Sequence, residues 1–131
     1  MIDDNPKTQF GIKKPPTWHV PFTGVFTAAL AHLHGALKYG SFNWREEPVS
    51  ASTYMDAAIR HIQQWKEGEE QAKDSGVHHL GHAIACLNIL VDAQNYGTLI
   101  DDRTKERMDY DEFFDKQQPT IKRLYDEWGP K

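Results

Sequence analysis

Several features that are common in small proteins are scarce in this sequence, and each gap excludes a class of protein. The 131 residues include a single cysteine, Cys86, so no disulfide can form within the chain, which fits a reducing cytosol. No apolar run approaches the roughly 20 residues that cross a bilayer, and Met1–Lys14 lacks the apolar segment of a signal peptide. The sequence therefore predicts a soluble, cytoplasmic protein without a membrane partner.

The sequence also lacks a surplus of positively charged residues and the familiar catalytic motifs. The formal net charge is −4, so duplex nucleic acid is not an expected partner, although a small nucleotide needs only a local cationic pocket. The sequence contains no glycine-rich P-loop, no GxSxG elbow, no HExxH and no paired CxxC. Hydrolysis through a covalent nucleophile therefore has little support.

What the sequence does contain is a series of amphipathic helices. Hydrophobic residues make up 39% of the chain, and its length predicts one domain with a single core. Apolar spacings of three and four residues predict three long helices, at Phe22–Lys38, Thr53–Glu67 and about Ser75–Asn95. A helical turn at Tyr110–Lys116 and a short tail helix beyond Pro119 follow. With no strand run and no internal repeat, the predicted fold is all-α, a small helical bundle.

The first 21 residues differ from the rest. Four prolines among polar residues oppose a helix, so residues 1–21 are expected to form an extended N-terminal arm before a helical domain at residues 22–131. In that domain the apolar side of each long helix is expected to be buried. These sides consist of Phe26, Ala29, Leu30, Leu33 and Leu37; Tyr54, Met55, Ala58, Ile59, Ile62 and Trp65; and Leu80, Ala83, Ile84, Leu87, Leu90 and Val91.

Candidate chemistry concentrates in residues 65–92, where an acidic helix end and a Ser-Gly turn precede a helix that opens on three histidines. On a helix, His78, His79 and His82 project from one side, and His79 and His82 border the apolar stripe. His61 lies beside the apolar edge of the preceding helix. One hypothesis is that imidazoles and acidic side chains converge on a divalent metal or a phosphate; the other is a histidine-rich helix start with ordinary capping. The acidic residues nearby are Glu67, Glu69, Glu70 and Asp74.

A second candidate site is the loop KYGSFNWR, residues 38–45, which follows the first long helix. Gly40 is expected to end that helix in a left-handed conformation. The loop brackets aromatic rings between two cations, an arrangement that suits a nucleotide because rings stack on a base and cations meet phosphates. The alternative is that the aromatic rings only seal the underside of the loop. Upstream, His32 is expected to be a surface residue rather than a ligand.

These residue types permit several chemistries. Imidazole together with carboxylate suits Zn²⁺, Mn²⁺, Fe or Ni, whereas an all-carboxylate site would point to Mg²⁺. A metal beside cations supports phosphoryl or pyrophosphoryl transfer. Without a metal, the histidines can still bind phosphate, or one of them can act as a general base near neutral pH.

Three segments, KYGSFNWR (38–45), YMDAAIRHIQQWKEGEE (54–70) and DSGVHHLGHA (74–83), resemble the phage dATP/dGTP diphosphohydrolase family, which is related to MazG-type nucleotide pyrophosphohydrolases. The resemblance implies that an oligomeric helical bundle cleaves a purine deoxynucleoside triphosphate to the monophosphate and pyrophosphate with Mg²⁺ or Mn²⁺. In a phage this would adjust the nucleotide pool of the host cytoplasm. His79 and His82 stand where MazG-type enzymes carry ExxD carboxylates, and the ExxE segment would end near His61.

Together these observations predict a site and two alternatives to catalysis. A homodimer or homotetramer is expected because the amphipathic helices are long for so short a chain. The first alternative is a non-catalytic module that sequesters a nucleotide or a nucleotide-derived signal, and the second is a helical oligomerisation protein with purely structural histidines. The predicted catalytic residues are Glu69, His79 and His82; the metal ligands are Glu69, Asp74, His79 and His82, with Glu67, Glu70 and His61 as further candidates; the substrate-binding residues are Lys38, Tyr39, Asn43, Trp44, Arg45, Arg60 and His61.

Overall fold

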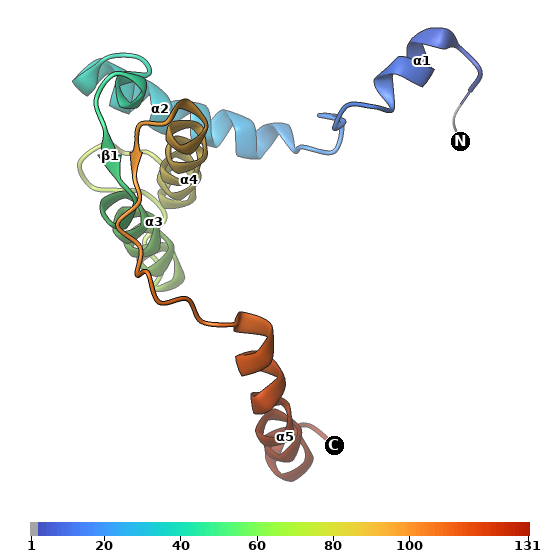
Figure 1. Cartoon of the computed structure of the whole chain (residues 1–131). Helices are drawn as coiled ribbons and strands as arrows, with labels where there is room; N and C mark the ends of the chain where they lie inside the picture. Colours follow the sequence, from blue (N-terminus) through green and yellow to red (C-terminus); the bar gives the residue numbers. More distant parts are fainter. Residues whose placement is uncertain (1–2) are drawn as a thin grey trace.

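The computed structural model describes residues 3–131 and consists mainly of helices (Figure 1). Three long helices, α2 (Phe22–Tyr39), α3 (Ala51–Lys66) and α4 (His79–Tyr96), form a bundle in which α4 contacts both of the others. The predicted all-α bundle of three long helices is therefore confirmed. Within residues 3–131, no helix combines the length and the apolar content that crossing a bilayer requires.

The two ends of the chain carry helices that lie apart from the bundle (Figure 1). The first, α1 (Pro6–Gly11), corrects the prediction of a fully extended arm. It forms because the Asn5 side chain accepts a hydrogen bond from the N–H of Lys7, and because proline is well tolerated at the first helical position. The last, α5 (Tyr110–Trp128), is 19 residues long, and none of its residues is buried. The prediction of a short C-terminal helix is therefore wrong.

Pro119 lies inside α5 instead of before it. A proline removes one helical hydrogen bond and bends the helix, but the helix continues when its other turns are well supported. The Asp109 side chain caps the first turn by accepting from the N–H of Glu112. Beyond the proline, exposed ion pairs one turn apart support the last turns, at Lys122–Asp126 and Arg123–Glu127.

Two short strands connect the ends of the bundle helices. β1 (Val49–Ser50) pairs in parallel with β2 (Leu99–Ile100). The prediction of no strand is wrong because strands of two residues are too short to show alternation. Just after β2, the Asp102 carboxylate accepts hydrogen bonds from the N–H and the hydroxyl of Ser52. This contact ties the segment after α4 to the first turn of α3.

Small side chains make the core of the bundle. The buried residues of the three helices are almost all alanines, and His79 is the one fully buried large side chain in the described part of the chain. Gly81 shows how closely α2 and α4 approach, since a Cβ there would lie 2.6 Å from the carbonyl oxygen of Thr27. The buried alanines of α2, α3 and α4 are Ala28, Ala31, Ala51, Ala58, Ala83, Ala85 and Ala93.

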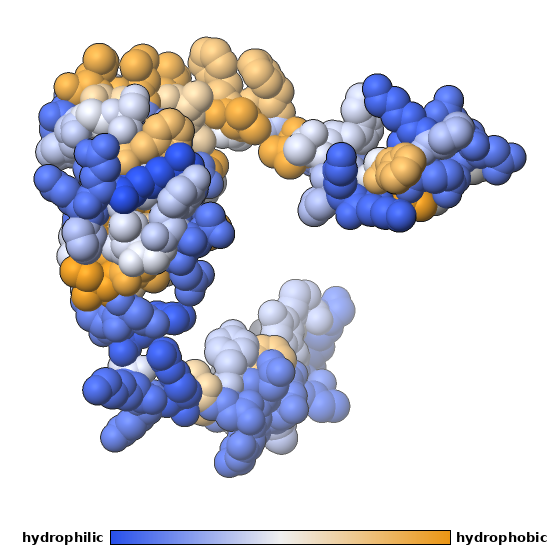
Figure 2. All heavy atoms as spheres, turned by 45° about the horizontal axis from the view of Figure 1, so that its top comes forward, coloured by the Kyte–Doolittle hydropathy of each residue, from blue (hydrophilic) through white to orange (hydrophobic). Residues whose placement is uncertain are grey.

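The prediction that the large apolar faces are buried is wrong for α2. Phe26, Leu33 and Leu37 are 53%, 53% and 78% exposed. The helix instead turns its small residues toward α4, because only they permit so close an approach. Figure 2 shows the apolar atoms of α2 gathered along the outside of the bundle. The same holds in part for α3 and α4, where Met55, Ile59, Ile62, Trp65, Ile84, Leu87 and Val91 are exposed. We call the exposed row Phe22, Phe26, Leu30, Leu33 and Leu37 the α2 stripe.

Two glycine-to-alanine changes should have opposite effects on the free energy of unfolding. Gly81→Ala should lower it by about 1–3 kcal/mol, because the new methyl group meets the backbone oxygen of Thr27 and pushes the helices apart. Gly35→Ala should raise it by up to about 1 kcal/mol, because its Cβ meets nothing within 4 Å and alanine favours the helix. Urea unfolding at one protein concentration measures both. A similar loss in both variants would contradict the close contact at Gly81.

Candidate functional site

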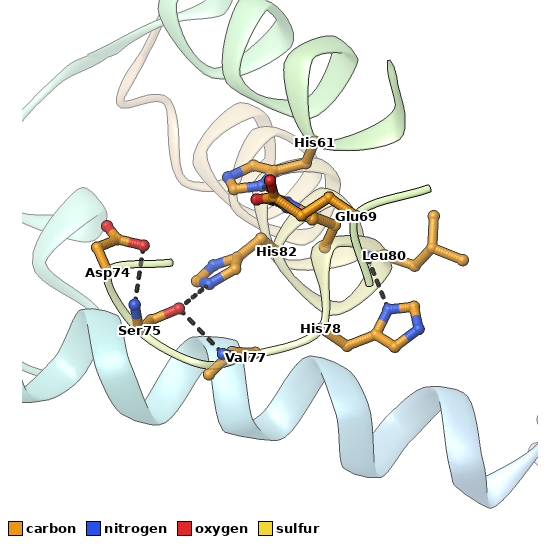
Figure 3. A network of polar contacts seen from close by, with 9 residues as sticks. His61, Glu69, Asp74, Ser75, Val77, His78, Leu80 and His82 are labelled. Atoms are coloured by element: carbon orange, nitrogen blue, oxygen red, sulfur yellow. Dashed lines mark hydrogen bonds and ion pairs between the residues drawn. The ribbon is translucent and has the colours of Figure 1, made fainter. Parts of the chain in front are cut away.

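Four histidines from three helices meet near the N-terminal end of α4. The ring of His61, from α3, stacks on the ring of His82, from α4, with centroids 4.7 Å apart and 17° between the planes (Figure 3). The ring of His34, from α2, meets the edge of His82 at 5.8 Å. His79 lies 5.1 Å from His61. We call these four residues the histidine cluster.

A chain of hydrogen bonds joins Glu69 to His79 and His79 to His61. Oε1 of Glu69 lies 2.8 Å from Nε2 of His79, and Nδ1 of His79 lies 2.8 Å from Nδ1 of His61. A carboxylate only accepts, so Nε2 of His79 donates, and the Nδ1 of a neutral His79 ring must then accept from Nδ1 of His61. This assignment leaves Nε2 of His61 with a free lone pair. That is the form in which an imidazole acts as a base.

Burial makes this arrangement of His79 rigid. Its side chain is 1% exposed, and no described buried side-chain polar atom lacks a hydrogen-bond partner. Because a buried polar group without a partner is costly, both ring nitrogens of His79 remain bonded. Glu69 is partly exposed and comes from the loop between α3 and α4. The pair therefore fixes both the tautomer and the orientation of the more exposed His61 ring.

The loop between α3 and α4 also positions His82. The Oγ of Ser75 lies 2.7 Å from Nε2 of His82 and accepts from the N–H of Val77 at 3.1 Å. The N–H of Ser75 donates to the Asp74 carboxylate at 2.8 Å. Figure 3 shows Asp74 and Ser75 on the side of His82 that lies away from His78. Ser75 therefore lies before the start of α4 and contacts the histidine cluster through His82.

His78 is not part of the cluster, which corrects the prediction that three histidines project from one side. It is the N-cap of α4, with an extended backbone, and its Nδ1 accepts from the N–H of Leu80. Its Nε2 lies 3.2 Å from the Glu70 carboxylate. Figure 3 shows the His78 ring apart from those of His61 and His82. The helix begins one residue too late for the expected spacing to include it.

Asp92, a residue with no sequence signal of function, holds the loop of residues 38–45, here called the aromatic loop, in place. Its Oδ2 accepts from Nε1 of Trp44 at 2.6 Å and from Nε of Arg45 at 2.8 Å. The Arg45 guanidinium also lies 4.1 Å from the ring centroids of both Phe42 and Tyr96. The hydrogen bond from Arg45, followed by that from Trp44, holds the pKa of Asp92 below its usual range. Arg45, predicted to bind phosphate, is thus already engaged by the fold.

A pocket of about 960 Å³ connects the two predicted sites. It lies between α2, α4 and the aromatic loop, and its volume is that of a typical small-molecule site. His34 and His82 line it from the histidine cluster, and Trp44 lines it from the loop. Residues as far apart in the sequence as His34 and His82 therefore share one cavity with Trp44. The other loop residues that line it are Tyr39, Gly40, Ser41, Phe42 and Asn43.

His32 also lines this pocket, so its assignment to the surface was wrong. Its Nε2 lies 3.1 Å from Nδ2 of Asn88, and its ring lies 6.0 Å from that of Trp44. Partial burial lowers the pKa of His32. The position was misjudged because the small residues of α2, rather than its large ones, face α4.

The remaining predicted residues are dispersed. Arg60 points outward and lies 3.9 Å from Asp56 in an exposed pair. Glu67 is the exposed C-cap of α3, whereas Glu70 pairs with His78 outside the cluster. Lys38 is exposed, with its Nζ 5.1 Å from the Tyr39 ring. Of the predicted catalytic and metal-binding residues, the structure brings together Glu69, His61, His79 and His82, with Asp74 next to Ser75.

The divalent ion implied by the resemblance requires donors that converge on one point. Within residues 3–131, no group of three or more His, Cys, Asp or Glu side chains is arranged to hold a metal ion. His79 would have to release Glu69 or His61 to bind one, because both ring nitrogens are bonded. Carboxylate oxygens of Glu69 and Asp74 do remain. The described residues therefore form no preassembled metal site, and a carboxylate oxygen of either residue would supply one ligand to a largely hydrated ion.

The cluster predicts how stability depends on pH. Burial, and then the neighbouring imidazoles, lower the pKa of His61 and His82. The folded protein therefore binds these protons more weakly than the unfolded chain, and the free energy of unfolding should fall as the pH drops below about 6.5. Urea unfolding at pH 7.5 and 5.5 measures this. The double variant His61→Gln, His82→Gln should show a smaller difference, and equal stability of the wild type at both pH values would contradict the assignment.

Comparison with known proteins adds one finding. A family model described as "dATP/dGTP diphosphohydrolase, N-terminal" matches residues 4–103. This stretch includes the whole bundle, the histidine cluster and the pocket, but not α5. No curated protein and no solved structure shows significant similarity to the chain. Since the match spans well over half of its length, the chain belongs to the family of dATP/dGTP diphosphohydrolase N-terminal regions.

Proposed function

We propose that the protein hydrolyses dATP and dGTP to the monophosphate and pyrophosphate. The observation that carries this proposal is a pocket that joins an aromatic wall to His34 and His82. The ring of His82 contacts that of His34 and stacks on that of His61, which is hydrogen-bonded to His79. The family description names both substrates. Aromatic rings and imidazoles in one cavity match the two parts of a nucleotide, a flat base and a phosphate chain.

The base binds beside Trp44. Asp92 fixes the indole through its Nε1 and so leaves a ring face ready for stacking, at no further cost in side-chain ordering when the ligand binds. The phosphates then extend toward His34 and His82. The exposed ammonium group of Lys38 lies next to the loop and attracts the negative charge of the substrate.

His61 acts as the general base in this proposal. Its Nε2 takes a proton from the water as the water oxygen bonds to the α-phosphorus. The bond from that phosphorus to the α,β-bridging oxygen breaks, and pyrophosphate leaves. The proton leaves a positive charge on His61. The Glu69 carboxylate stabilises this charge through two hydrogen bonds, one from His79 to Glu69 and one from His61 to the fixed ring of His79. Glu69 and His79 are thus positioning residues, and His61 is the residue that contacts the reacting water.

The resemblance implies a divalent ion, Mg²⁺ or Mn²⁺. Such an ion, bound together with the triphosphate, would supply neutralisation of negative charge on the phosphate oxygens. The free carboxylate oxygens of Glu69 and Asp74 are the groups of this chain that would hold it. This role requires no metal centre assembled in advance, in keeping with the dispersed donors among residues 3–131.

We further propose that the active form is a homo-oligomer, a dimer or a tetramer. The chain exposes 10929 Å², whereas a compact monomer of its mass exposes about 7,100 Å². The exposed excess includes the α2 stripe, and a core of alanines provides little apolar burial to stabilise an isolated bundle. A second copy of this chain offers the same stripe and so a matching apolar surface.

Product analysis tests the proposal directly. The protein is incubated with dATP, dGTP, dCTP or dTTP and Mn²⁺ or Mg²⁺, and the products are separated by ion-exchange chromatography. We expect pyrophosphate and the monophosphate from the two purine substrates. Release of orthophosphate alone, or no product with any of these ions, would overturn the proposal.

Sequestration of a nucleotide is the second candidate function, and the lack of a preassembled metal centre in the described residues favours it. Calorimetry that shows tight dGTP binding, followed by recovery of unchanged dGTP, would select it over hydrolysis. The two outcomes exclude each other when binding and product release are measured on one sample.

A further inference from the structure

We infer that Asn88 and His32 form a reversible hydrogen-bonded pair that reads the 6-position of a purine and lets one pocket accept both adenine and guanine. This inference rests on the proposed function, because it concerns the base of the same substrate. It assigns a specificity role to two residues outside the histidine cluster. Neither residue lies near the reacting phosphates in the proposed binding mode.

The pair spans the two helices that form the pocket. Nδ2 of Asn88, on α4, lies 3.1 Å from Nε2 of His32, on α2, and both residues line the cavity. The His32 ring centroid lies 6.0 Å from that of Trp44. Since Asn88, His32 and Trp44 line one cavity, we place the base against the indole with its edge toward the carboxamide.

Adenine and guanine require opposite hydrogen-bonding partners at the 6-position. Adenine carries an amino group at the 6-position, which donates, whereas guanine carries a carbonyl oxygen, which accepts; N7 accepts in both. A side chain that only donates, or only accepts, would satisfy one base and leave the other with an unmatched polar group. A pocket that takes both bases needs a group that can do either.

Asn88 can do either because its carboxamide has almost the same shape after rotation by 180°, which exchanges oxygen and nitrogen. In the observed arrangement its nitrogen donates to His32, so its oxygen can accept from the amino group of adenine. After rotation the oxygen faces His32, and the nitrogen can donate to the oxygen of guanine. The partner must then donate where it previously accepted.

His32 can make that change because a neutral imidazole carries its proton on either nitrogen. Within residues 3–131, no hydrogen bond holds its other nitrogen, Nδ1, so the protein fixes neither tautomer. Burial lowers the pKa of His32, which keeps the ring neutral near pH 7. His79 is the opposite case, since Glu69 and His61 hold both of its nitrogens.

Other polar groups of the pocket are less suited to this role. Trp44 only donates, and its Nε1 is already bonded to Asp92. Asn95 lines the pocket without a histidine partner in the described chain and so offers a matched control. Asn88 and His32 are therefore the pair to change.

Two substitutions should shift base preference in opposite directions. In Asn88→Asp the side chain presents only acceptors, so the variant should favour adenine. In His32→Lys the ammonium group only donates and holds the Asn88 oxygen. The Asn88 nitrogen then faces the base, so this variant should favour guanine. Calorimetry with α,β-methylene analogues of dATP and dGTP gives the ratio of the two Kd values. We expect each variant to change this ratio about tenfold, the size of one mismatched base contact. Any effect of the added charge on the triphosphate cancels in the ratio.

The control and the possible results separate this inference from the proposed function. Asn95→Asp adds the same charge to the pocket and should leave the ratio unchanged. An unchanged ratio in Asn88→Asp and His32→Lys, or a shift of both in one direction, would overturn the inference while purine hydrolysis by the wild type could stand. Opposite shifts without pyrophosphate release would support the inference and overturn hydrolysis. Failure of the wild type to bind either analogue would overturn both.

Discussion

Replacing His61 with alanine should lower kcat for pyrophosphate release by about 10²–10⁴-fold, the usual contribution of a general base. The reason is the direction of the hydrogen bonds, which leaves Nε2 of His61 free to accept a proton. His61 is only partly buried, so the variant should remain folded. Single-turnover measurements with dGTP and Mn²⁺, together with circular dichroism, separate loss of chemistry from loss of structure.

Glu69→Gln tests whether Glu69 and His61 act as one unit. Glutamine can still accept from His79, so the ring keeps its orientation, but the negative charge is lost. We expect a smaller loss of kcat than in His61→Ala and little change in KM. The double variant should be no slower than His61→Ala alone, because residues of one catalytic unit do not contribute independently.

His78→Ala is the matched control for these variants. His78 lies directly before His79 but caps the helix outside the cluster, so kcat should stay within a few-fold of the wild type. An equal loss in His78→Ala and His61→Ala would show that the effect comes from disturbing the start of α4. Independent, multiplying losses in the Glu69 and His61 double variant would also contradict the proposed chain.

Leu33→Asp should dissociate the protein into monomers. Leu33 is 53% exposed in the isolated chain and lies in the middle of the α2 stripe. In an oligomer that buries the stripe, the substitution places a charge in an apolar contact, where it has no partner. Light scattering coupled to size-exclusion chromatography should show a fall from the oligomer mass to 15.1 kDa. Stability should also become lower and independent of protein concentration.

Two controls define this result. Leu33→Met conserves volume and should keep the oligomer mass. Gln64→Asp adds the same charge to an exposed position of α3 outside its apolar face and should also keep it. A wild type that elutes as a monomer at micromolar concentration would overturn the proposed assembly, as would a Leu33→Asp variant of unchanged mass.

The extents of the three long helices could be predicted to within a few residues because periodicity and capping are local. Gly40, with positive φ, ends α2 at the predicted place. Gly97, also with positive φ, ends α4 close to the predicted Asn95. Burial could not be predicted in the same way. An apolar stripe shows which side of a helix avoids water, but not whether the same chain or another copy covers it. In α2 the small residues pack against α4, and the large apolar residues are exposed.

The residue types of the site could be predicted, but the hydrogen bonds between them could not. His61, Glu69 and His79 stand out in the sequence because imidazoles and carboxylates have known chemistry. That they form one hydrogen-bonded chain depends on how α3, the following loop and α4 meet. Asp92, Asn88 and Ser75 carry no signal, since an isolated polar residue on a helix or in a turn is usually solvated.

By itself, the amino-acid sequence determined the helical character of this protein, the family to which it belongs and the set of groups available for chemistry. These properties depend on neighbours within a few residues or on residue identity alone. Only the tertiary structure decided that small residues form the core and that hydrogen bonds join Glu69 to His79 and His79 to His61. It also decided that one pocket joins the aromatic loop to His34 and His82. The physical reason is that hydrogen-bond direction and burial depend on distances between segments that are far apart in the chain.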